Sequence, residues 1–492
     1  MQTNFHTEAI FELFDAVQTA ELFADQKTFC DAIPKFEVEI INQKFSTEKN
    51  LKNFDLKDFV NANFDFKNED LLVEIVENLP IEKHIDQLWK VLTREAKDNK
   101  SSLLALPKPY IVPGGRFNEF FYWDSYFVML GLQVSGEKEM AKNIVDNCDF
   151  LIQTIGFVPN GNRTYFLSRS QPPYFSLMVE LLVEIYGDES LYEKYLPSLI
   201  KEYDFWMNGS DEFSESNAHK RVVKLNNENI LNRYNDTDNS PRPESYLIDI
   251  LDKKKTENPD FYNDVRSACE SGWDFSSRWF SDPQDISTIQ TQSILPIDLN
   301  CLLFHYEKTL ENFFSKTDIE KSDYYKSKSE KRKSAVQKYL YDEKTGVFSD
   351  YNFKENKISK SISAAMAYPL FLNIATEDQA INTAKNIEKF LLKDGGIITT
   401  DIISGQQWDA PNAWAPLQWI CFKGLKNYGF DDLADKIKNN WCENVERVYA
   451  NTGKLMEKYN AMDTSQKAGG GEYPNQDGFG WTNGVYLKMK NS

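Results

Sequence analysis

Residues 85–92 read IDQLWKVL, and their apolar side chains recur with the spacing of one helical face. The apolar positions stand at i, i+3, i+4 and i+7, which is typical of an amphipathic helix: Ile85, Leu88, Trp89 and Leu92. Similar periodicity recurs over 137–153, 175–186, 295–314, 361–374, 377–392, 414–427 and 431–449. Strand-like alternation is scarce, and GVFSDYN at 346–352 is the best short candidate. The charged, lysine-rich segment 315–338 is interpreted as a solvated helix face. The sequence therefore predicts a mostly helical protein.

The segments between the predicted helices are long and rich in Gly, Pro, Trp, Asn and paired charges. Loops of such length within a compact domain are usually either functional or disordered. An aromatic content of 14% argues against disorder. Helical hairpins wound into a closed ring would place such loops on one face. We therefore expect one large all-α domain with a site built from loops.

The chain has 492 residues and a formal net charge of −19. Such a surface repels nucleic acid and anionic membranes, so we expect neither as a partner. It also disfavours a polyanionic substrate and favours a neutral one. No apolar run of about 18 residues occurs, so no membrane span is predicted.

Cysteine and histidine usage offers no sign of a metal or redox site. The six cysteines are scattered without a CxxC pair, and the four histidines lie far apart in the sequence. We expect no metal and no cofactor. The N-terminal residues MQTNFHTEAIFELFDAVQ carry acids early and lack an unbroken apolar core, which is not typical of a secretory signal. Free thiols and this N-terminus predict a cytoplasmic protein, which we expect to be a monomer.

A glycine-rich stretch at 467–484, KAGGGEYPNQDGFGWTNG, fits two functions. It could cradle phosphates, or it could lie over a neutral, hydroxyl-rich ligand. The stretch lacks the GK[ST] ending of a P-loop, and no GxGxxG opens a helix after it. Glu472 and Asp477 would also repel phosphate. The hydroxyl-rich ligand is therefore the better hypothesis.

Two aspartates stand beside tryptophans. In PGGRFNEFFYWDSYF (113–127), Asp124 next to Trp123 suits a pair of sugar hydroxyls, but the segment taken alone favours a turn and a helix with core aromatics. In ACESGWDFSSRWF (268–280), Asp274 could be desolvated among aromatic rings, which would keep it protonated as a general acid. The alternative is an aspartate that caps a helix.

Four further stretches have a functional and a structural interpretation. PNGNRTYFLSRSQPP (159–173) offers amides and guanidinium groups that bind vicinal hydroxyls, or it is a surface loop. SPRPESY (240–246) holds a rigid pair of opposite charges for hydroxyl recognition, or a local ion pair. The stretch QQWDAPNAWAPLQW (406–419) predicts either an aromatic wall of a site or a buried loop-to-helix connection whose tryptophans belong to the core. In LMEKYN (455–460), residue physics alone does not single out Glu457.

The sequence contains no motif typical of other kinds of catalysis. There is no GxSxG elbow, no EF-hand spacing and no P-loop. The chemistry that remains is that of two carboxylates acting on a neutral polyol, which is the scheme of the glycoside hydrolases.

The motifs resemble those of a known family. PGGRFNEFFYWDSY and QWDAPNAWAP resemble the two signature patterns of the trehalases, glycoside hydrolase family 37. Further stretches look like hallmarks of the same family: ESGWDFSSRW, GGGEYPNQDGFGWTNGV and the N-terminal ELFDAVQTAELFADQKTFCDAIP (12–34). The resemblance runs from about residue 12 to 488. It implies an (α/α)6 barrel over residues 61–492, with an N-terminal extension, 1–60, packed on it.

The resemblance also implies a reaction, the inverting hydrolysis of α,α-trehalose to two glucose molecules. Asp274 would be the general acid and Glu457 the general base, about 6.5–9.5 Å apart so that a water fits between them. The glycine-rich stretch would be a lid. The remaining residues would hold the sugars: Arg116, Trp123, Asp124, Asn160, Arg169, Ser170, Gln171, Arg242, Pro243, Glu244, Gly272 and Glu472.

The chain departs from the family pattern in two places. Ala413 stands where the second signature usually has glycine, and Lys467 and Ala468 shorten the glycine run. The main hypothesis is an active trehalase. Two alternatives are an α-barrel glucosidase with another substrate and a catalytically silent sugar-binding or sensing protein.

Overall fold

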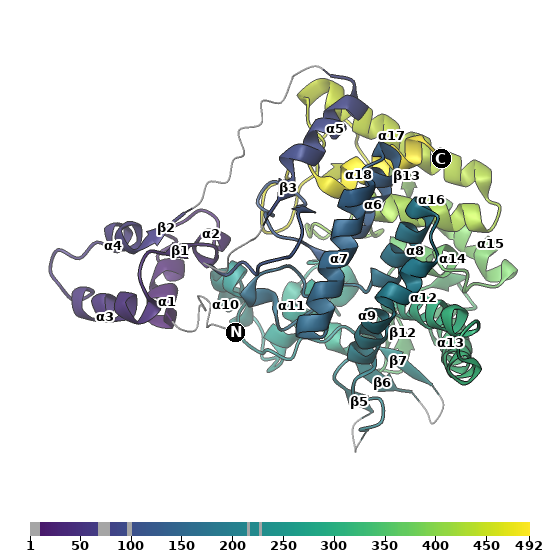
Figure 1. Ribbon diagram of the computed structural model, residues 1–492, viewed down its shortest axis with the longest axis horizontal. Helices are drawn as coiled ribbons and strands as arrows, with labels where there is room; N and C mark the ends of the chain where they lie inside the picture. The colour runs from purple at the N-terminus through teal and green to yellow at the C-terminus, as the bar shows by residue number, and fades with distance from the viewer. Residues whose placement is uncertain (1–9, 67–78, 96–100, 214–216, 226–228) are drawn as a thin grey trace.

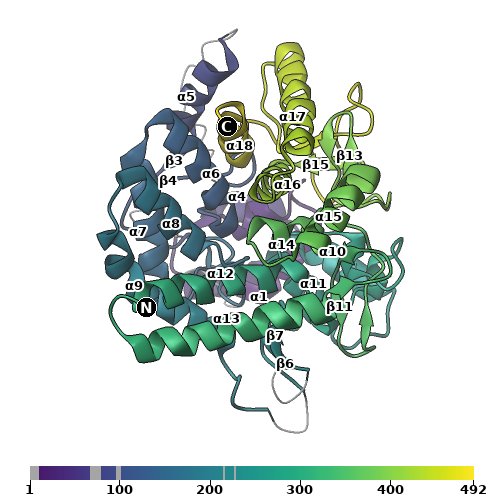
Figure 2. The same ribbon diagram turned by 90° about the vertical axis from the view of Figure 1, so that its right-hand side faces the viewer.

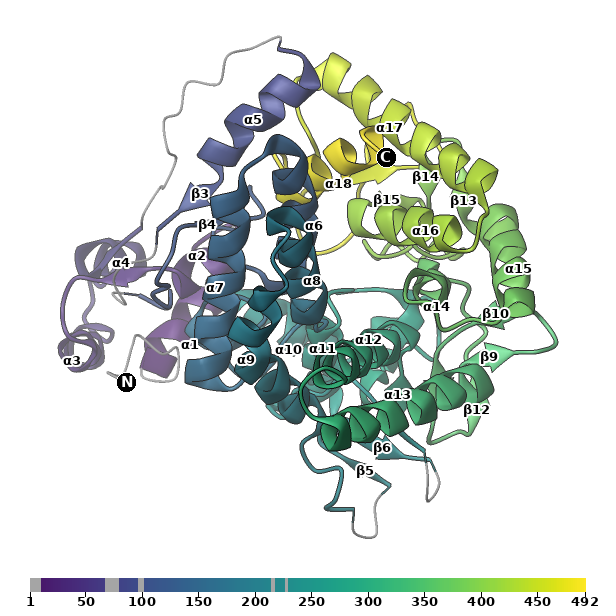
Figure 3. The ribbon, with the colours of Figure 1, turned by 45° about the vertical axis from the view of Figure 1, so that its right-hand side comes forward.

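The helices form a double ring in the computed structural model, which describes residues 10–66, 79–95, 101–213, 217–225 and 229–492 (Figures 1 and 3). The inner helices are α6 (Tyr122–Ser135), α8 (Phe175–Tyr186), α12 (Ile297–Phe314), α14 (Tyr368–Phe371), α16 (Ala415–Asn427) and α18 (Gly480–Lys490). The outer helices are α5 (Ile81–Val91), α7 (Lys138–Ile155), α9 (Ser190–Met207), α13 (Ile319–Tyr339), α15 (Glu377–Asn386) and α17 (Asp431–Thr452). The last inner helix, α18, packs on the first, α6, and so closes the ring. The predicted all-α fold class is confirmed.

The burial of each helix follows its sequence. The inner helix α8 reads FSLMVELLVEIY and is apolar almost all round, as expected for a helix enclosed by neighbours. The outer helix α7 buries only one stripe of apolar side chains. The charged helix α13 lies beside α12 and buries a narrow face that includes Tyr325 and Val336 (Figure 2). The expected solvated helix at 315–338 therefore forms, with one face packed on the ring.

The expected helix over 361–374 is wrong in extent. The segment forms a 3-10 turn at Ala364–Ala367 and the short helix α14. Helix α14 ends at Phe371, and just after it Asn373 adopts a left-handed backbone, φ 57°, and the amide of Ile374 donates to the carbonyl of Pro369. The expected helix over 377–392 is also shorter: α15 ends at Asn386 and a π turn follows over Ile387–Leu391.

Strands are short and serve as connections. The predicted strand at 346–352 becomes two, β10 (Val347–Phe348) and β11 (Tyr351–Asn352), which belong to different sheets. The antiparallel pair β15 (Asn412–Trp414) and β16 (Lys458–Asn460) joins two segments distant in sequence, with Trp414 opposite Lys458. This pair carries part of the site described below.

The N-terminal residues have a small core of their own, seen at the purple end of Figure 1. Its helices are α1 (Phe11–Thr19), α2 (Lys27–Cys30), α3 (Val38–Glu48) and α4 (Leu56–Asn63). Phe121, Phe166 and Tyr246 from the loops of the ring complete this core. The boundary between residues 60 and 61 stays a prediction.

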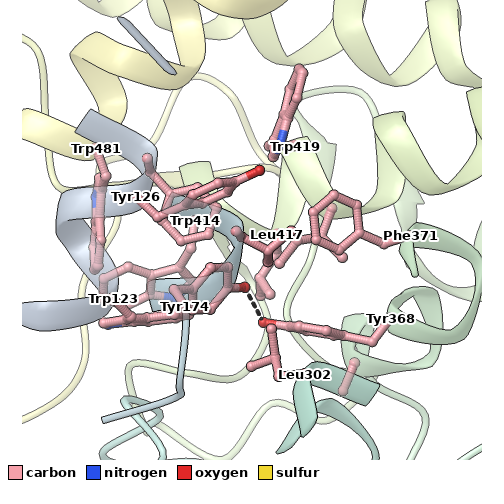
Figure 4. Close-up of a cluster of buried hydrophobic side chains, with 14 of the residues drawn as sticks. Trp123, Tyr126, Tyr174, Leu302, Tyr368, Phe371, Trp414, Leu417, Trp419 and Trp481 are labelled. Carbon is pink, nitrogen blue, oxygen red and sulfur yellow. Dashed lines mark hydrogen bonds between the residues drawn. The ribbon is translucent and has the colours of Figure 1, made fainter. Parts of the chain in front are cut away.

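A layer of aromatic rings that includes residues from the starts of four inner helices lies inside the ring (Figure 4). Trp123, Tyr174, Tyr368 and Trp414 are all buried there, and the hydroxyls of Tyr174 and Tyr368 lie 2.8 Å apart. The ring has two ends, one where the inner helices begin and one where they end. No helix among the described residues is long and apolar enough to cross a bilayer.

Candidate active site

A cavity lies at the end of the ring where the inner helices begin, and it gathers most of the residues implied by the family resemblance. Those that line it are Arg116, Trp123, Asp124, Asn160, Arg169, Gln171, Arg242, Glu244, Gly272, Asp274, Glu457 and Glu472. Ser170 and Pro243 do not line it. The Ser170 hydroxyl donates to the carbonyl of Val158, 2.7 Å away, and the Pro243 carbonyl accepts from Gln18 at 3.2 Å.

Asp274 follows helix α11 (Phe261–Glu270) and a tight turn at Gly272, whose φ is +74°. A Cβ at Gly272 would come within 2.9 Å of the Trp123 indole, so this position also needs glycine for space. Burial raises the pKa of the Asp274 carboxyl to about 7. Among the described residues it forms no ion pair, although the charges of Arg242 and Arg169 oppose the shift. A carboxyl with these properties holds a proton near neutral pH.

Glu457 stands directly before β16 and is held on several sides. The Tyr473 hydroxyl donates to its Oε1 at 2.9 Å, and Lys458 Nζ lies 3.4 Å from its Oε2. Its amide donates to the carbonyl of Gln476 at 2.9 Å, and the indole of Trp481 donates to its carbonyl at 3.0 Å. Burial raises its pKa, while Lys458 and Tyr473 act in the opposite direction. Glu457 is thus a buried carboxylate with a cation beside it.

Asp124 lies in the first turn of α6, facing the same cavity. Burial raises the pKa of its carboxyl well above the usual range, and the negative charges of Glu457 and Asp274 raise it further. The neighbouring Trp123 is fixed through its amide, which donates to the Gln171 side chain at 3.1 Å. The cavity therefore holds two buried carboxyl groups, of Asp124 and Glu457, and a partly buried one, of Asp274.

Three arginines enter the cavity in pairs with carboxylates. Arg169 Nη2 lies 2.7 Å from Glu244 Oε1, and Arg242 Nη2 lies 2.8 Å from Glu472 Oε1. The Nε and Nη1 atoms of Arg169 and the Oε2 atom of Glu244 are buried yet make no hydrogen bond within the described part of the chain. Buried donors and acceptors of this kind usually have partners, so these atoms are suited to a polar ligand.

The third arginine, Arg116, draws the N-terminal residues into the site. Its guanidinium binds both carboxylate oxygens of Asp25, at 2.7 and 2.8 Å. Lys27, which also lines the cavity, bonds to Glu119 at 2.6 Å. The sequence alone assigns no function to Asp25 or Lys27. Nothing in their local pattern indicates that the start of α2 and the residues before it reach Arg116 and Glu119.

The glycine loop, residues 467–479, packs over the cavity. A Cβ at Gly471 would come within 2.9 Å of the Gln407 side chain, and one at Gly470 within 2.6 Å of the Gly405 carbonyl. Both residues have φ +82°. Only glycine fits this close approach without strain. The loop carries Tyr473 to Glu457 and Glu472 to Arg242.

Of the two departures from the family pattern, Ala413 lies in β15, buried and paired with Tyr459. An alanine fits this extended position, so the ribbon accommodates its methyl group. Sequence reasoning missed two polar residues next to the carboxylates, Gln407 and Lys458. Gln407 Nε2 donates to the Asp274 carbonyl at 2.6 Å, and its Oε1 accepts from Lys458 Nζ at 2.8 Å.

Comparison with known proteins identifies relatives across nearly the whole chain. The trehalase family model matches residues 21–491. Periplasmic trehalases of Salmonella paratyphi B and Escherichia coli O6:H1 are each 47% identical over 483 residues, which is 97% of this chain and 85% of theirs. The neutral trehalase of Saccharomyces cerevisiae matches with a TM-score of 0.64 and 26% identity, over 78% of this chain and 73% of that chain. A mannosylglycerate hydrolase from Thermus thermophilus shares the fold, with a TM-score of 0.56 at 16% identity, over 84% of this chain and 100% of that chain.

The expected cytoplasmic location is wrong, because the relatives at 47% identity are periplasmic trehalases. They point to the periplasm. The cysteines that suggested a reducing compartment carry no such information, since all six are free and buried. Buried thiols are inert in either compartment.

The family model covers most of the chain, the relatives agree with it, and the fold is the one that the motifs implied. The chain belongs to the trehalase family.

Proposed function

We propose that the protein is an α,α-trehalase that cleaves the 1,1-glycosidic bond of trehalose and inverts the configuration at the attacked carbon. The observation that carries this proposal is the contrast between two carboxyls in one cavity. Asp274 has a pKa of about 7 and no ion pair among the described residues, whereas Glu457 has Lys458 beside it. Carboxyl groups whose environments differ in this way can serve as acid and base.

In the proposed reaction, the Asp274 carboxyl donates its proton to the glycosidic oxygen as the bond to the anomeric carbon breaks. Glu457 takes a proton from a water molecule, which attacks that carbon from the opposite face. One glucose leaves with its configuration retained and the other is formed with inverted configuration. Asp274 ends ionised and Glu457 protonated, and exchange of protons with solvent restores both. No cofactor takes part.

The substrate is held, in this proposal, by the polar groups around the two carboxyls. The atoms of Arg169 and Glu244 that make no hydrogen bond among the described residues, and the carboxyl of Asp124, would bind sugar hydroxyls. Trp123, Asn160, Gln171, Arg116, Arg242, Gly272 and Glu472 line the same cavity and would shape it. Ser170 and Pro243 would support the cavity without touching the sugar, because they do not line it and their polar atoms form hydrogen bonds within the protein.

The net charge of −19 supports a neutral disaccharide over a phosphorylated one. That the protein is a monomer, and that it binds neither membrane nor nucleic acid, remain proposals. The two alternatives, a silent sugar-binding protein and a glucosidase for another substrate, are disfavoured because the matching family and the relatives are trehalases.

A glucose-release assay on trehalose, trehalose 6-phosphate and maltose tests the proposal. We expect rapid release from trehalose and little from the other two. Release from maltose alone would favour the other glucosidase. Binding of trehalose without release from any of the three would favour the silent sugar-binding protein.

A further inference from the structure

Lys458 is a buried lysine next to the proposed base, and no role in the reaction has yet been given to it. Its side chain is 0% exposed. Buried lysines are rare unless they are paired, because removing an ammonium group from water is costly. The fold therefore maintains this charge at a specific place.

The backbone fixes that place. Lys458 lies in β16, opposite Trp414 of β15, and its main chain exchanges two hydrogen bonds with the side chain of Asn475 from the glycine loop, at 2.9 and 3.3 Å. Its Nζ lies 5.1 Å from the ring centre of Trp414 and 5.2 Å from that of Tyr473. Two aromatic faces thus guide the ammonium group to Gln407 Oε1 and Glu457 Oε2.

The groups that face Glu457 come from several elements. Lys458 is its own neighbour, Tyr473 comes from the glycine loop, Asp124 from α6 and Asp274 from the segment after α11. Negative charges on Asp124 and Glu457 disfavour each other, whereas the charge of Asp274 acts on Lys458. Lys458 is its only ion-pair partner among the described residues.

We propose that Lys458 is a positioning residue that keeps Glu457 ionised and aligned, and so decides which of the two carboxyls acts as the base. This inference rests on the proposed function. Gln407 links Lys458 to the proposed acid, since its side chain accepts a hydrogen bond from Lys458 and donates one to the Asp274 carbonyl. Lys458 itself touches no reacting atom in this account.

The pH profile of kcat/KM tests the proposal in a matched pair of variants, Lys458→Met and Gln407→Met. Both variants lose the hydrogen bond between Lys458 and Gln407, but only the first loses the charge. An opposite charge at this range lowers a carboxyl pKa by about 1 to 3 units. We expect the acid limb of Lys458→Met to move to higher pH by about that amount, and the limb of Gln407→Met to stay within about 0.5 unit. Equal limbs in Lys458→Met and wild type, or equal shifts in both variants, would overturn the proposal.

Thermal unfolding gives a second readout that needs no turnover. At pH 8, Lys458→Met leaves a buried Glu457 without its cation, and Glu457→Gln removes the charge that is left. We expect the double variant to unfold at a higher temperature than Lys458→Met alone. We also expect Lys458→Met to gain stability relative to wild type as the pH falls, because the raised pKa makes folded Glu457 take up a proton. Additive effects in the double variant would assign Lys458 to packing and overturn the proposal. If wild type releases no glucose, the proposed function fails, and the unfolding cycle still reports whether Lys458 and Glu457 are coupled.

Discussion

The two ends of the inner-helix ring are built from the same helices, yet their charged side chains differ in burial and in pairing. The basin is the wide cavity where the inner helices end, and its volume is 1210 Å³ against 90 Å³ for the cavity where they begin. Its lysines include Lys426 in the last turn of α16 and Lys488 in the last turn of α18. Lysines there complement the negative ends of the helix dipoles. At the other end, Arg169 and Arg242 pair with Glu244 and Glu472, while Asp124 and Asp274 have no ion-pair partner among the described residues.

The volume of a cavity alone therefore does not locate an active site. Cavity volume alone would select the basin as the active site. Its lysines Lys426 and Lys488, however, are explained by their positions at the C-terminal ends of helices. The narrow end contains carboxyls with raised pKa and, within the described part of the chain, buried polar atoms without a hydrogen bond. Perturbed titratable groups of this kind often mark functional sites. Of the aromatic residues in Figure 4, Trp123 and Trp414 line the narrow cavity, and Tyr126 and Trp419 line the basin.

The largest contrast is expected from amide substitutions of carboxyls at the two ends. Asp274→Asn and Glu457→Gln should each lower kcat by about 10²- to 10⁴-fold, the usual contribution of a general acid or base. The matched control is Glu184→Gln in the basin, which should keep kcat near wild type. Steady-state kinetics on trehalose check this. Substantial turnover in either site variant would refute its role.

A stability contrast is expected from arginine and lysine substitutions. Arg242→Met leaves the buried carboxylate of Asp249 unpaired and should cost about 3 to 5 kcal/mol in the free energy of unfolding. Lys423→Met in the basin should change it by less than about 0.5 kcal/mol. Denaturant titrations of both variants measure the difference. Similar costs would mean that burial of charge does not distinguish the two ends.

The pH dependence should report Asp274. Its raised pKa of about 7 means that the acid is protonated below pH 7 and loses its proton above it, so kcat/KM should fall as the pH rises through about 7. Initial rates between pH 4 and 9 in a constant-ionic-strength buffer test this. A profile that stays flat up to pH 9 would rule out Asp274 as the acid.

The smallest contrast concerns two glycines with positive φ. Gly471→Ala adds a methyl group against Gln407, whereas Gly453→Ala at the end of α17 meets nothing within 4 Å. Both pay a strain cost of about 1 kcal/mol for an alanine in the left-handed region. Only Gly471→Ala should also reduce kcat/KM, by about 10-fold if the displaced loop loses about 1.4 kcal/mol of transition-state binding. Equal kcat/KM in the two variants would show that the glycine loop does not need this close fit.

Much of this fold could be predicted from the sequence, because helical periodicity in segments such as 175–186 and 431–449 reports burial directly. The short helix α14 could not, since a left-handed turn at Asn373 ends a segment whose apolar spacing continues.

Of the site, the motif-bearing residues were predicted through family resemblance, and most of them line one cavity. Gln407 and Asp25 were missed because their importance arises from contacts across 51 to 133 positions of sequence. Lys458 was missed although it stands next to Glu457, because a lysine beside a glutamate is usually exposed and this one is buried. The compartment was predicted wrongly because buried free cysteines do not report the redox state outside the fold.

Proton NMR of the first minutes of trehalose hydrolysis tests the central claim most directly, because it follows the anomeric signals of both glucose products before mutarotation mixes them. The two-carboxylate account predicts equal early amounts of α- and β-glucose, one from each half of the substrate. Early release of α-glucose alone would mean retention of configuration, and would contradict the roles given to Asp274 and Glu457.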